Sequence, residues 1–430
     1  MHSDLFQRSR PLLDRLSAAN HAAADRYPGN RGARQPIHTV YGGAHLFRST
    51  TARKLGELAE RAFALHAAKP QDLASVIGIH DQEIAANVHA KVAEKLASEP
   101  VEDFRIDFED GFGTRSSEEE DRVACEAAQQ LAVAEQDGTR PPFIGIRIKS
   151  LEDSTAERSI RTLDLFLRVL VERCGGKLPT NFVVTLPKVS IPEQVSALVE
   201  LFTVLENELN LAENSLRLEI MIELTRTLFD GSGRSMLPQL IDAAQGRCTG
   251  AHFGTYDYTA SCSILAAHQT MGHRASDFAL QLMKIGFADT GIALSDGATN
   301  IMPIGERETV HEAWKLASRN IRQSLVNGFF QGWDLHPAQL PIRFATTYAF
   351  FLESLAPAAE RLRNFLDQAA QATRVGNVFD DAATGQGLLN VFLRGISCGA
   401  FAADEVANAT GLTERELQLR SFAAILNQRQ

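Results

Sequence analysis

The chain has few cysteines, no long apolar run and no secretory signal, and each absence excludes a class of protein. Its five cysteines form no Cys-x-x-Cys pair, so we expect reduced thiols rather than a disulfide framework or a zinc site. The uncharged stretch Tyr258 to His273 contains a glutamine and two histidines, which excludes a membrane-spanning helix there. The first 27 residues mix charges of both signs and lack an apolar core, which predicts a cytoplasmic protein.

The chain also has fewer basic than acidic residues. The chain has 43 Lys plus Arg against 53 Asp plus Glu, a formal charge of −10, which disfavours nucleic acids and anionic membranes as partners. With 44% hydrophobic and 22% charged residues, the composition is that of a globular protein, which excludes disorder of the whole chain.

Several catalytic and binding motifs are missing. The sequence contains no GxxxxGK[ST], HExxH, GxSxG or EF-hand loop. These absences leave no support for a P-loop nucleotidase, a zinc peptidase, a serine hydrolase of the GxSxG type or an EF-hand calcium site.

Short apolar runs alternate with longer segments of helical period, which indicates a parallel sheet wrapped by crossover helices. The clearest helices are expected at Ser117–Ala134, Glu157–Arg173, Pro192–Leu209 and Arg307–Val326. The strands are expected at His38–Tyr41, Phe104–Phe108, Phe143–Ile148, Phe182–Leu186, Leu216–Ile222, Gly250–Phe253, Gly291–Leu294 and Gly332–Leu335. Eight such units predict an α/β fold of the (β/α)8 TIM-barrel class.

The spacing of polar residues near the strand ends supports the barrel and sets the domain limits. From Asp107 to His336 these residues recur 34 to 41 residues apart, but 66 residues separate Tyr41 from Asp107. We therefore expect an insertion after strand 1, with a helix around Asp81–Ala97. The expected organisation is an N-terminal helical extension (1–37), the barrel (38–340) and a C-terminal all-helical region (341–430), interrupted by a loop at Arg374–Gln386.

Carboxylates gather where strands two, five and six end. Asp107, Glu109 and Asp110 directly follow an apolar run, and such crowding requires a compensating cation, although solvated loop acids and helix caps are an equal alternative. Glu223 and Asp257 follow strands five and six. Two carboxylates from adjacent strand ends are a common way to hold Mg²⁺ while leaving room for water and substrate.

Two basic residues are expected on the same rim. Arg147 lies in Gly-Ile-Arg-Ile-Lys on strand three, where an interior guanidinium requires an anion. It either binds a substrate carboxylate or stabilises a developing enolate, or it only neutralises the acids of strand two. Lys188 allows the same two interpretations, and a Schiff-base role is a third.

Together these residues resemble the citrate lyase beta-subunit and malyl-CoA lyase family, within the HpcH/HpaI aldolase and phosphoenolpyruvate/pyruvate-domain superfamily. The resemblance covers about residues 38–345. Its motifs are His38–Gly43, Asp107–Asp110, Arg147, Pro187-Lys188, Ile222-Glu223, Phe253–Asp257, Asp296-Gly297 and Gly332–Gln339.

The resemblance implies roles for individual residues. Glu223 and Asp257 match the ligands of Mg²⁺, with Mn²⁺ as an alternative ion. His336 matches a structural histidine, and the resembling enzymes are usually homo-oligomers. The implied catalytic residues are Arg147, Asp107, Glu109, Asp110 and Lys188, and the implied substrate-binding residues are Arg147, Gly254, Thr255, Tyr256 and Asp296.

The sequence also departs from the family pattern. Asp110 stands where aldolases of the HpcH/HpaI type carry a histidine, Leu224 replaces a threonine after the metal-binding glutamate, and Lys149 replaces an asparagine. The resemblance therefore predicts a different substrate and a different general base from those of the aldolases.

The leading hypothesis is a magnesium-dependent carbon–carbon lyase of aldol or Claisen type. It would act on a keto acid or a hydroxyacyl substrate, including CoA thioesters, through an enolate that a metal ion stabilises. The alternatives are a non-catalytic barrel that binds a metal and a keto acid, and an enzyme that uses phosphoenolpyruvate or pyruvate. A further hypothesis is that the loop Arg374–Gln386, with Asp380 and Asp381, closes over the barrel mouth; the alternative is an ordinary surface loop.

Overall fold

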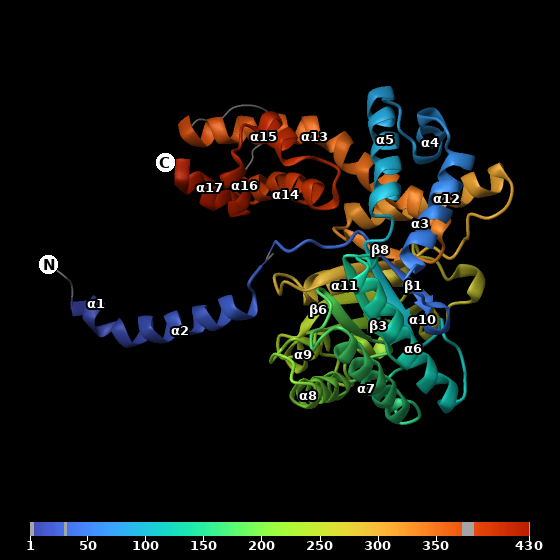
Figure 1. Cartoon of the computed structure of the whole chain (residues 1–430). Helices are drawn as coiled ribbons and strands as arrows, with labels where there is room; N and C mark the ends of the chain where they lie inside the picture. Colours follow the sequence, from blue (N-terminus) through green and yellow to red (C-terminus); the bar gives the residue numbers. More distant parts are fainter. Residues whose placement is uncertain (1–3, 30–31, 372–381, 430) are drawn as a thin grey trace.

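A computed structural model describes residues 4–29, 32–371 and 382–429. Eight parallel strands form a closed barrel in chain order, each paired with its neighbours and β8 paired with β1 (Figure 1). The predicted (β/α)8 barrel is therefore confirmed. The strands are β1 (His38–Gly43), β2 (Asp103–Asp107), β3 (Phe143–Arg147), β4 (Phe182–Leu186), β5 (Leu218–Ile222), β6 (Cys248–Phe253), β7 (Ala293–Ala298) and β8 (Gln331–Asp334).

Alternation along the strands separates an apolar outer surface from a polar interior. On β2, Phe104 and Ile106 belong to the hydrophobic core, whereas Arg105 bonds to Thr185 and Glu219 of β4 and β5, which are not neighbours of β2. Such contacts between non-adjacent strands are possible only across the barrel. Successive side chains of a strand point to opposite faces, so Asp107, two residues after Arg105, also faces inward.

The strand predictions were correct in number, but seven of the eight strands differ from the predicted limits at one end or both, most of them by one or two residues. Strand seven was expected at Gly291–Leu294 and lies at Ala293–Ala298, because Gly291 has a φ of 75°, outside the extended region that a strand requires. Strand five begins at Leu218 rather than Leu216.

Helices cover the outside of the barrel. The four helices whose limits were predicted begin and end within two residues of the predicted positions. They pack their apolar faces on the strands, as amphipathic helices do. The barrel helices include α6 (Ser117–Gln136), α7 (Ala156–Arg173), α8 (Pro192–Glu208), α9 (Leu237–Ala243), α11 (Arg274–Gly286) and α12 (Arg307–Val326).

The insertion after β1 is larger than the single helix predicted around Asp81–Ala97. It holds three helices, α3 (Thr51–His66), α4 (Pro70–Ile77) and α5 (Gln82–Ser98). Asp81 is not part of α5 but its N-cap, and its carboxylate accepts the N–H groups of Glu83 and Ile84, which explains the difference at that end.

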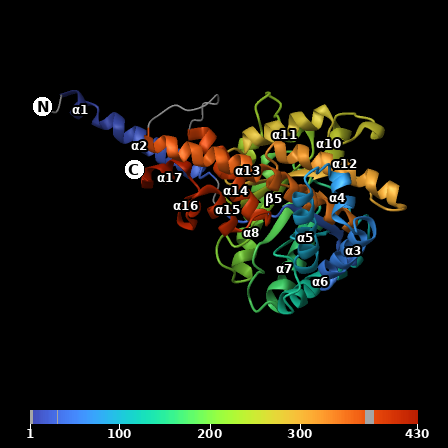
Figure 2. The same cartoon turned by 90° about the horizontal axis from the view of Figure 1, so that it is seen from above.

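The C-terminal region is helical, as expected, and consists of α13 (Leu340–Gln371), α14 (Ala382–Cys398), α15 (Ala403–Thr410), α16 (Glu414–Leu419) and α17 (Phe422–Arg429). Helix α13 packs against α5, α12 and α14 (Figure 2). The predicted loop Arg374–Gln386 was wrong at its end, because residues 382–386 form the first turn of α14. Residues 372–381, with Asp380 and Asp381, lie outside the described residues.

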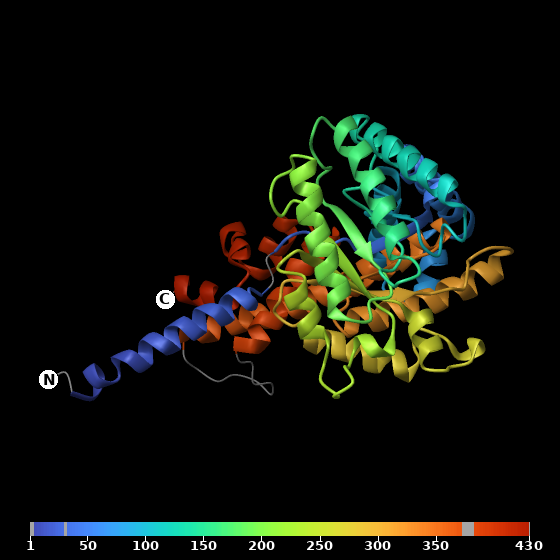
Figure 3. The same ribbon diagram turned by 90° about the horizontal axis from the view of Figure 1, so that it is seen from below.

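The N-terminal extension is also helical, with α1 (Asp4–Arg8) and α2 (Arg10–Arg26). No residue of α2 is buried, and in all three views this helix extends away from the barrel on the side of the C-terminal helices (Figure 3). No helix within the described ranges combines the length and apolar character that a membrane crossing requires.

Candidate functional site

The C-terminal ends of β2 to β6 bring seven of the predicted side chains to one rim of the barrel. All parallel strands end on this rim, which is why residues far apart in sequence meet there. We call this group the rim cluster; it consists of Asp107, Glu109, Asp110, Arg147, Lys188, Glu223 and Asp257.

Arg147 is fixed in the rim cluster by two carboxylates. Its Nε and Nη2 atoms donate to the two oxygens of Asp107 over 2.7 and 2.5 Å, and its Nη1 lies 3.1 Å from Glu109 Oε2. Burial opposes the charge, but Asp107 and Glu109 raise the pKa of the guanidinium above its ordinary value. Arg147 is therefore a fixed cation whose Nη1 end faces the other acids.

The guanidinium of Arg147 lies over the ring of Tyr41, which in turn packs against the ring of Trp333. Its carbon lies 4.9 Å from the centre of the Tyr41 ring, and Tyr41 packs against Trp333 with ring centres 4.5 Å apart. The Tyr41 hydroxyl is buried and has no hydrogen-bond partner among the residues described. Tyr41 and Trp333 lie in two motifs of the family resemblance, but no individual role was predicted for either residue. Side chains alternate along β1, so Tyr41 lies on the same face as Thr39. This alternation was the signal from which the direction of the Tyr41 side chain could have been predicted.

The side chain of Lys188 lies among the carboxylates of the rim cluster. Its backbone has a φ of 51°, in the left-handed region that non-glycine residues seldom adopt, and its N–H donates to Glu223 Oε1 over 2.5 Å. Its ammonium contacts Glu109 and lies 3.4 Å from Asp110 and 3.8 Å from Asp257. Although burial opposes it, Glu223 and Glu109 raise the pKa of Lys188, so the side chain is a cation that joins three strand ends.

The two predicted metal ligands differ in exposure. The Glu223 residue is 1% exposed, and burial raises its pKa to about 8, with the charge of Asp257 acting in the same direction. Asp257 lies in the first turn of α10 (Thr255–Ser261), with 41% of its side chain exposed. In the part of the chain that the structure describes, no three His, Cys, Asp or Glu side chains are grouped to hold a metal ion. A cation held by Glu223 and Asp257 would therefore have no third His, Cys, Asp or Glu ligand among the residues described.

Gly254 creates the space that Glu223 occupies. A Cβ at this glycine would lie 2.4 Å from Glu223 Cβ and 2.6 Å from Glu223 Oε2. Real side chains do not approach so closely, so a larger residue at position 254 would displace the carboxylate. The glycine thus has a steric role at the rim.

The remaining predicted residues lie near the rim cluster but make other contacts. Thr255 is buried, and its hydroxyl has no partner within the described ranges. The Tyr256 hydroxyl donates to Ala298 O and accepts the N–H of Asn300. Asp296 accepts the Ser324 hydroxyl of α12 and its neighbour's backbone N–H. None of the contacts described joins Asp296 to the rim cluster.

The histidine of the last motif is a helix cap, in keeping with its expected structural role. His336 Nδ1 accepts the N–H of Ala338 at the start of a short helix, Pro337–Gln339. Its neighbour Gln339 donates to Thr299 O, which ties the loop after β8 to the loop after β7.

A second buried charge cluster, deeper in the barrel, was not predicted. Arg105 forms ion pairs with Asp103 and with Glu219, and Glu219 also lies 3.0 Å from the ring of His252. His252 in turn accepts the indole N–H of Trp333 over 3.3 Å. The signal in the sequence was the alternation of Asp103, Arg105 and Asp107 with apolar residues.

Comparisons with known proteins agree with this architecture. A citrate lyase from Burkholderia xenovorans LB400 superposes with a TM-score of 0.58 at 16% identity, over 88% of this chain and 96% of that one. This similarity shows a shared barrel fold. A malate synthase from Haloferax volcanii (TM-score 0.44, 15% identity, 88% and 97% covered) and an HpcH/HpaI aldolase/citrate lyase family protein from Burkholderia cenocepacia J2315 (0.37, 14%, 64% and 90%) are more distant.

A comparison with proteins of curated function found no match. A family model, described as a domain of unknown function (DUF6986), matches residues 16–425. Because this match includes both the barrel and the C-terminal helices, the chain belongs to the DUF6986 family.

Proposed function

We propose that the protein is a magnesium-dependent carbon–carbon lyase, or the corresponding condensing enzyme, that acts on a small carboxylate or acyl thioester through an enolate. The observation that carries this proposal is the rim cluster, in which a fixed guanidinium, a lysine and five carboxylates meet where the strands end. The barrel shared with a protein described as a citrate lyase supports the same reaction class.

The charge balance of the rim cluster supports a bound cation. Its five carboxylates carry a formal −5 and its two basic side chains +2, which leaves −3 when all are ionised. Crowded carboxylates repel one another unless a cation compensates them. A divalent ion would remove most of this excess.

The two proposed ligands fit Mg²⁺. Both are carboxylates, which this ion prefers, and with only two protein ligands several positions stay open for water and substrate oxygens. One oxygen of Glu223 accepts the Lys188 N–H, and the other faces the space beside Gly254. Bound Mg²⁺ would supply positive charge that stabilises the oxygen of an enolate.

The chain's own residues would bind and orient the substrate. The Nη1 end of Arg147 lies toward Glu109 and Asp110, and from this position it would donate to a substrate carboxylate or carbonyl oxygen. Asp107 holds the opposite edge of the guanidinium, so the donor is positioned before substrate binds. Lys188 fixes Glu223 through its N–H and neutralises Glu109 through its ammonium.

A substitution at Gly254 tests the metal site without removing a ligand. Gly254→Ala is expected to weaken Mg²⁺ binding about 10- to 100-fold, the usual cost of disturbing a residue that orients a ligand. The physical reason is the overlap of the new Cβ with Glu223. Gly272→Ala is the matched control, because a Cβ there meets nothing within 4 Å. Calorimetric titration with Mg²⁺ measures both; equal affinities in the two variants would contradict this role of Gly254.

A substrate panel distinguishes an enzyme from a binding protein. Purified protein is incubated with 2-keto acids, 3-hydroxyacyl thioesters and aldehydes, singly and in pairs, with Mg²⁺ or with EDTA. The proposal predicts cleavage or condensation of at least one substrate that requires Mg²⁺. Metal-dependent binding without any turnover would overturn the enzymatic proposal and favour a binding protein.

A further inference from the structure

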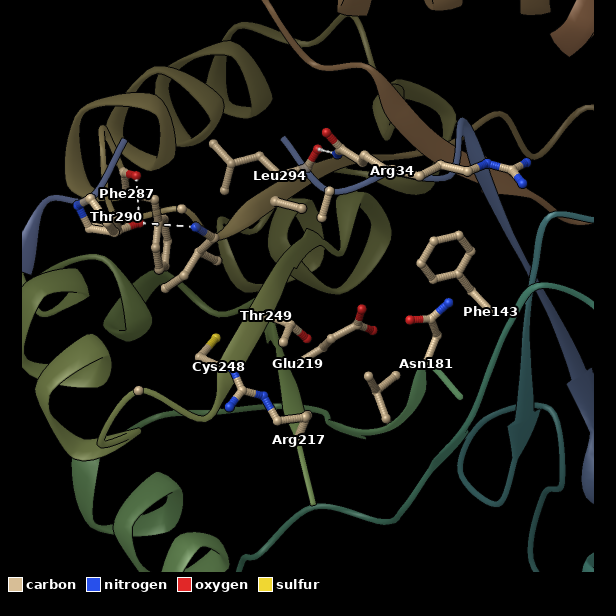
Figure 4. Close-up of a pocket in the computed structure, with 18 of the residues that line it drawn as sticks. Arg34, Phe143, Asn181, Arg217, Glu219, Cys248, Thr249, Phe287, Thr290 and Leu294 are labelled. Carbon is tan, nitrogen blue, oxygen red and sulfur yellow. Dashed lines mark hydrogen bonds between the residues drawn. The ribbon is translucent and has the colours of Figure 1, made fainter. Parts of the chain in front are cut away.

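A cavity of about 1420 Å³ lies at the end of the barrel opposite the rim cluster. Its walls come from the residues that precede and begin the strands, from the segment that leads into β1, and from α14. No member of the rim cluster lines it. The close-up shows Glu219 extending toward the middle of this space, with Leu294, Phe143 and Asn181 around it (Figure 4).

Three basic side chains from α11, from α14 and from the segment after α16 line this cavity and have no carboxylate partner among the residues described. We call them the floor cations; they are Lys284 of α11, Arg394 of α14 and Arg420, which follows α16. Lys284 donates to Gly328 O over 3.1 Å, and Arg394 donates to Gln35 Oε1 over 2.9 Å. Both acceptors are uncharged, so neither contact neutralises a positive charge.

Three other basic side chains at the cavity are paired with carboxylates, and Lys177 lines it as well. Arg26 pairs with Asp242 at 2.6 Å, Arg34 with Glu102 at 3.1 Å, and Arg105 with Glu219 at 2.5 Å. Asp25 and Asp289 also line the cavity, but neither forms an ion pair with a floor cation in the described ranges. The positive charge of the floor cations is therefore locally uncompensated.

The floor cations also act on one another. Burial lowers the pKa of Lys284, and the charge of Arg394 lowers it further. Burial and then the charge of Arg420 lower the pKa of Arg394. Cations that repel each other in a partly buried space are stabilised when an anion is placed among them.

The cavity walls combine these charges with apolar and amide groups. The Arg394 guanidinium carbon lies 4.6 Å from the centre of the Phe330 ring, and Leu393 beside it also lines the cavity. Asn390 and Gln386 lie about one and two turns before Arg394 on α14 and line the same cavity. Clefts of this kind, apolar with a few converging polar groups, hold small organic ligands.

We propose that the floor cations form a binding site for a small organic polyanion that carries phosphate or carboxylate groups. Guanidinium groups bind both kinds of oxyanion through paired N–H donors, and a lysine adds a point charge. Lys284 belongs to the barrel, and Arg394 and Arg420 belong to the C-terminal region, so the bound anion links these two parts of the chain. This site is separate from the proposed metal site.

The test is a calorimetric titration of the full chain with pyrophosphate and, separately, with tricarballylate, in EDTA and at matched ionic strength. The two probes represent the phosphate and the carboxylate source. The expected result is saturable binding of at least one probe, weakened about tenfold by Arg394→Gln and by Arg420→Gln, since each removes a charged hydrogen-bond donor. Arg420 is exposed, so its variant is expected to fold normally.

Two control variants locate the binding. Lys315→Gln removes an exposed cation that already pairs with Glu312 on α12, and Lys188→Gln removes the cation of the rim cluster. Both are expected to bind the probe like the unsubstituted protein. The proposal is overturned if neither probe binds, if Arg394→Gln and Arg420→Gln bind as tightly as the unsubstituted chain, or if Lys188→Gln alone abolishes binding. Because no divalent metal is present, this result does not depend on the proposed lyase activity.

Discussion

Asp257→Asn is expected to abolish Mg²⁺-stimulated turnover while the protein stays folded. The substitution removes the charge of one proposed ligand but keeps the size of the side chain. Because 41% of that side chain is exposed, the cost in stability is expected to be small. Loss of the stabilising cation is expected to lower kcat/KM by about 10³-fold or more. Initial rates over a range of Mg²⁺ concentrations measure the effect, and thermal unfolding checks the fold.

The control for this variant is Asp242→Asn at the other end of the barrel. Asp242 is likewise exposed and pairs with Arg26, so its loss removes a surface carboxylate without touching the rim cluster. Normal metal stimulation is expected for it. If Asp257→Asn also kept its full response to Mg²⁺, Asp257 would not be a metal ligand.

Arg147→Met is expected to have a large effect on both stability and activity. Asp107 is 1% exposed, and without the guanidinium its carboxylate is left buried without its cation. Breaking a buried ion pair in this way costs about 3–5 kcal/mol of unfolding free energy. Activity per folded molecule is expected to fall about 10²- to 10³-fold, because a charged donor to the substrate is also lost. Urea unfolding and steady-state kinetics measure the two effects.

The double substitution Arg147→Met with Asp107→Asn separates the two roles of the arginine. Removing the buried charge is expected to recover part of the stability but none of the activity. Arg247→Met provides a matched structural control, since Arg247 is 3% exposed and pairs with Glu206 at 2.6 Å, away from the rim cluster. It is expected to destabilise the protein and leave kcat unchanged. Recovery of kcat in the double variant would show that Arg147 acts only through packing.

The sequence was sufficient to predict the barrel and the membership of the rim cluster, because both follow from local patterns. Strand-length apolar runs recur at regular spacing between helical segments, and several strands end in or just before a charged residue such as Asp107 or Glu223. In a parallel barrel all such ends meet on one rim. These two predictions therefore did not require knowledge of which side chains contact one another across the barrel.

What could not be predicted depends on contacts across the barrel. The ion pair of Arg105 with Glu219 joins β2 to β5, and the pattern of one strand does not reveal which residue faces it from another. The same is true of the contact between Arg147 and Tyr41. The left-handed backbone of Lys188, which aims its N–H at Glu223, also has no signature in its residue type.

The central claim is that Glu223 and Asp257 hold one divalent ion beside Arg147. Its most direct test is a crystal soaked with Mn²⁺ and a small keto acid, with the metal located by its anomalous scattering. The account predicts one strong peak about 2.2 Å from a carboxylate oxygen of each residue, with the keto acid between the metal and Arg147. A peak bound to other side chains, or saturating Mn²⁺ with no peak at the rim cluster, would contradict it.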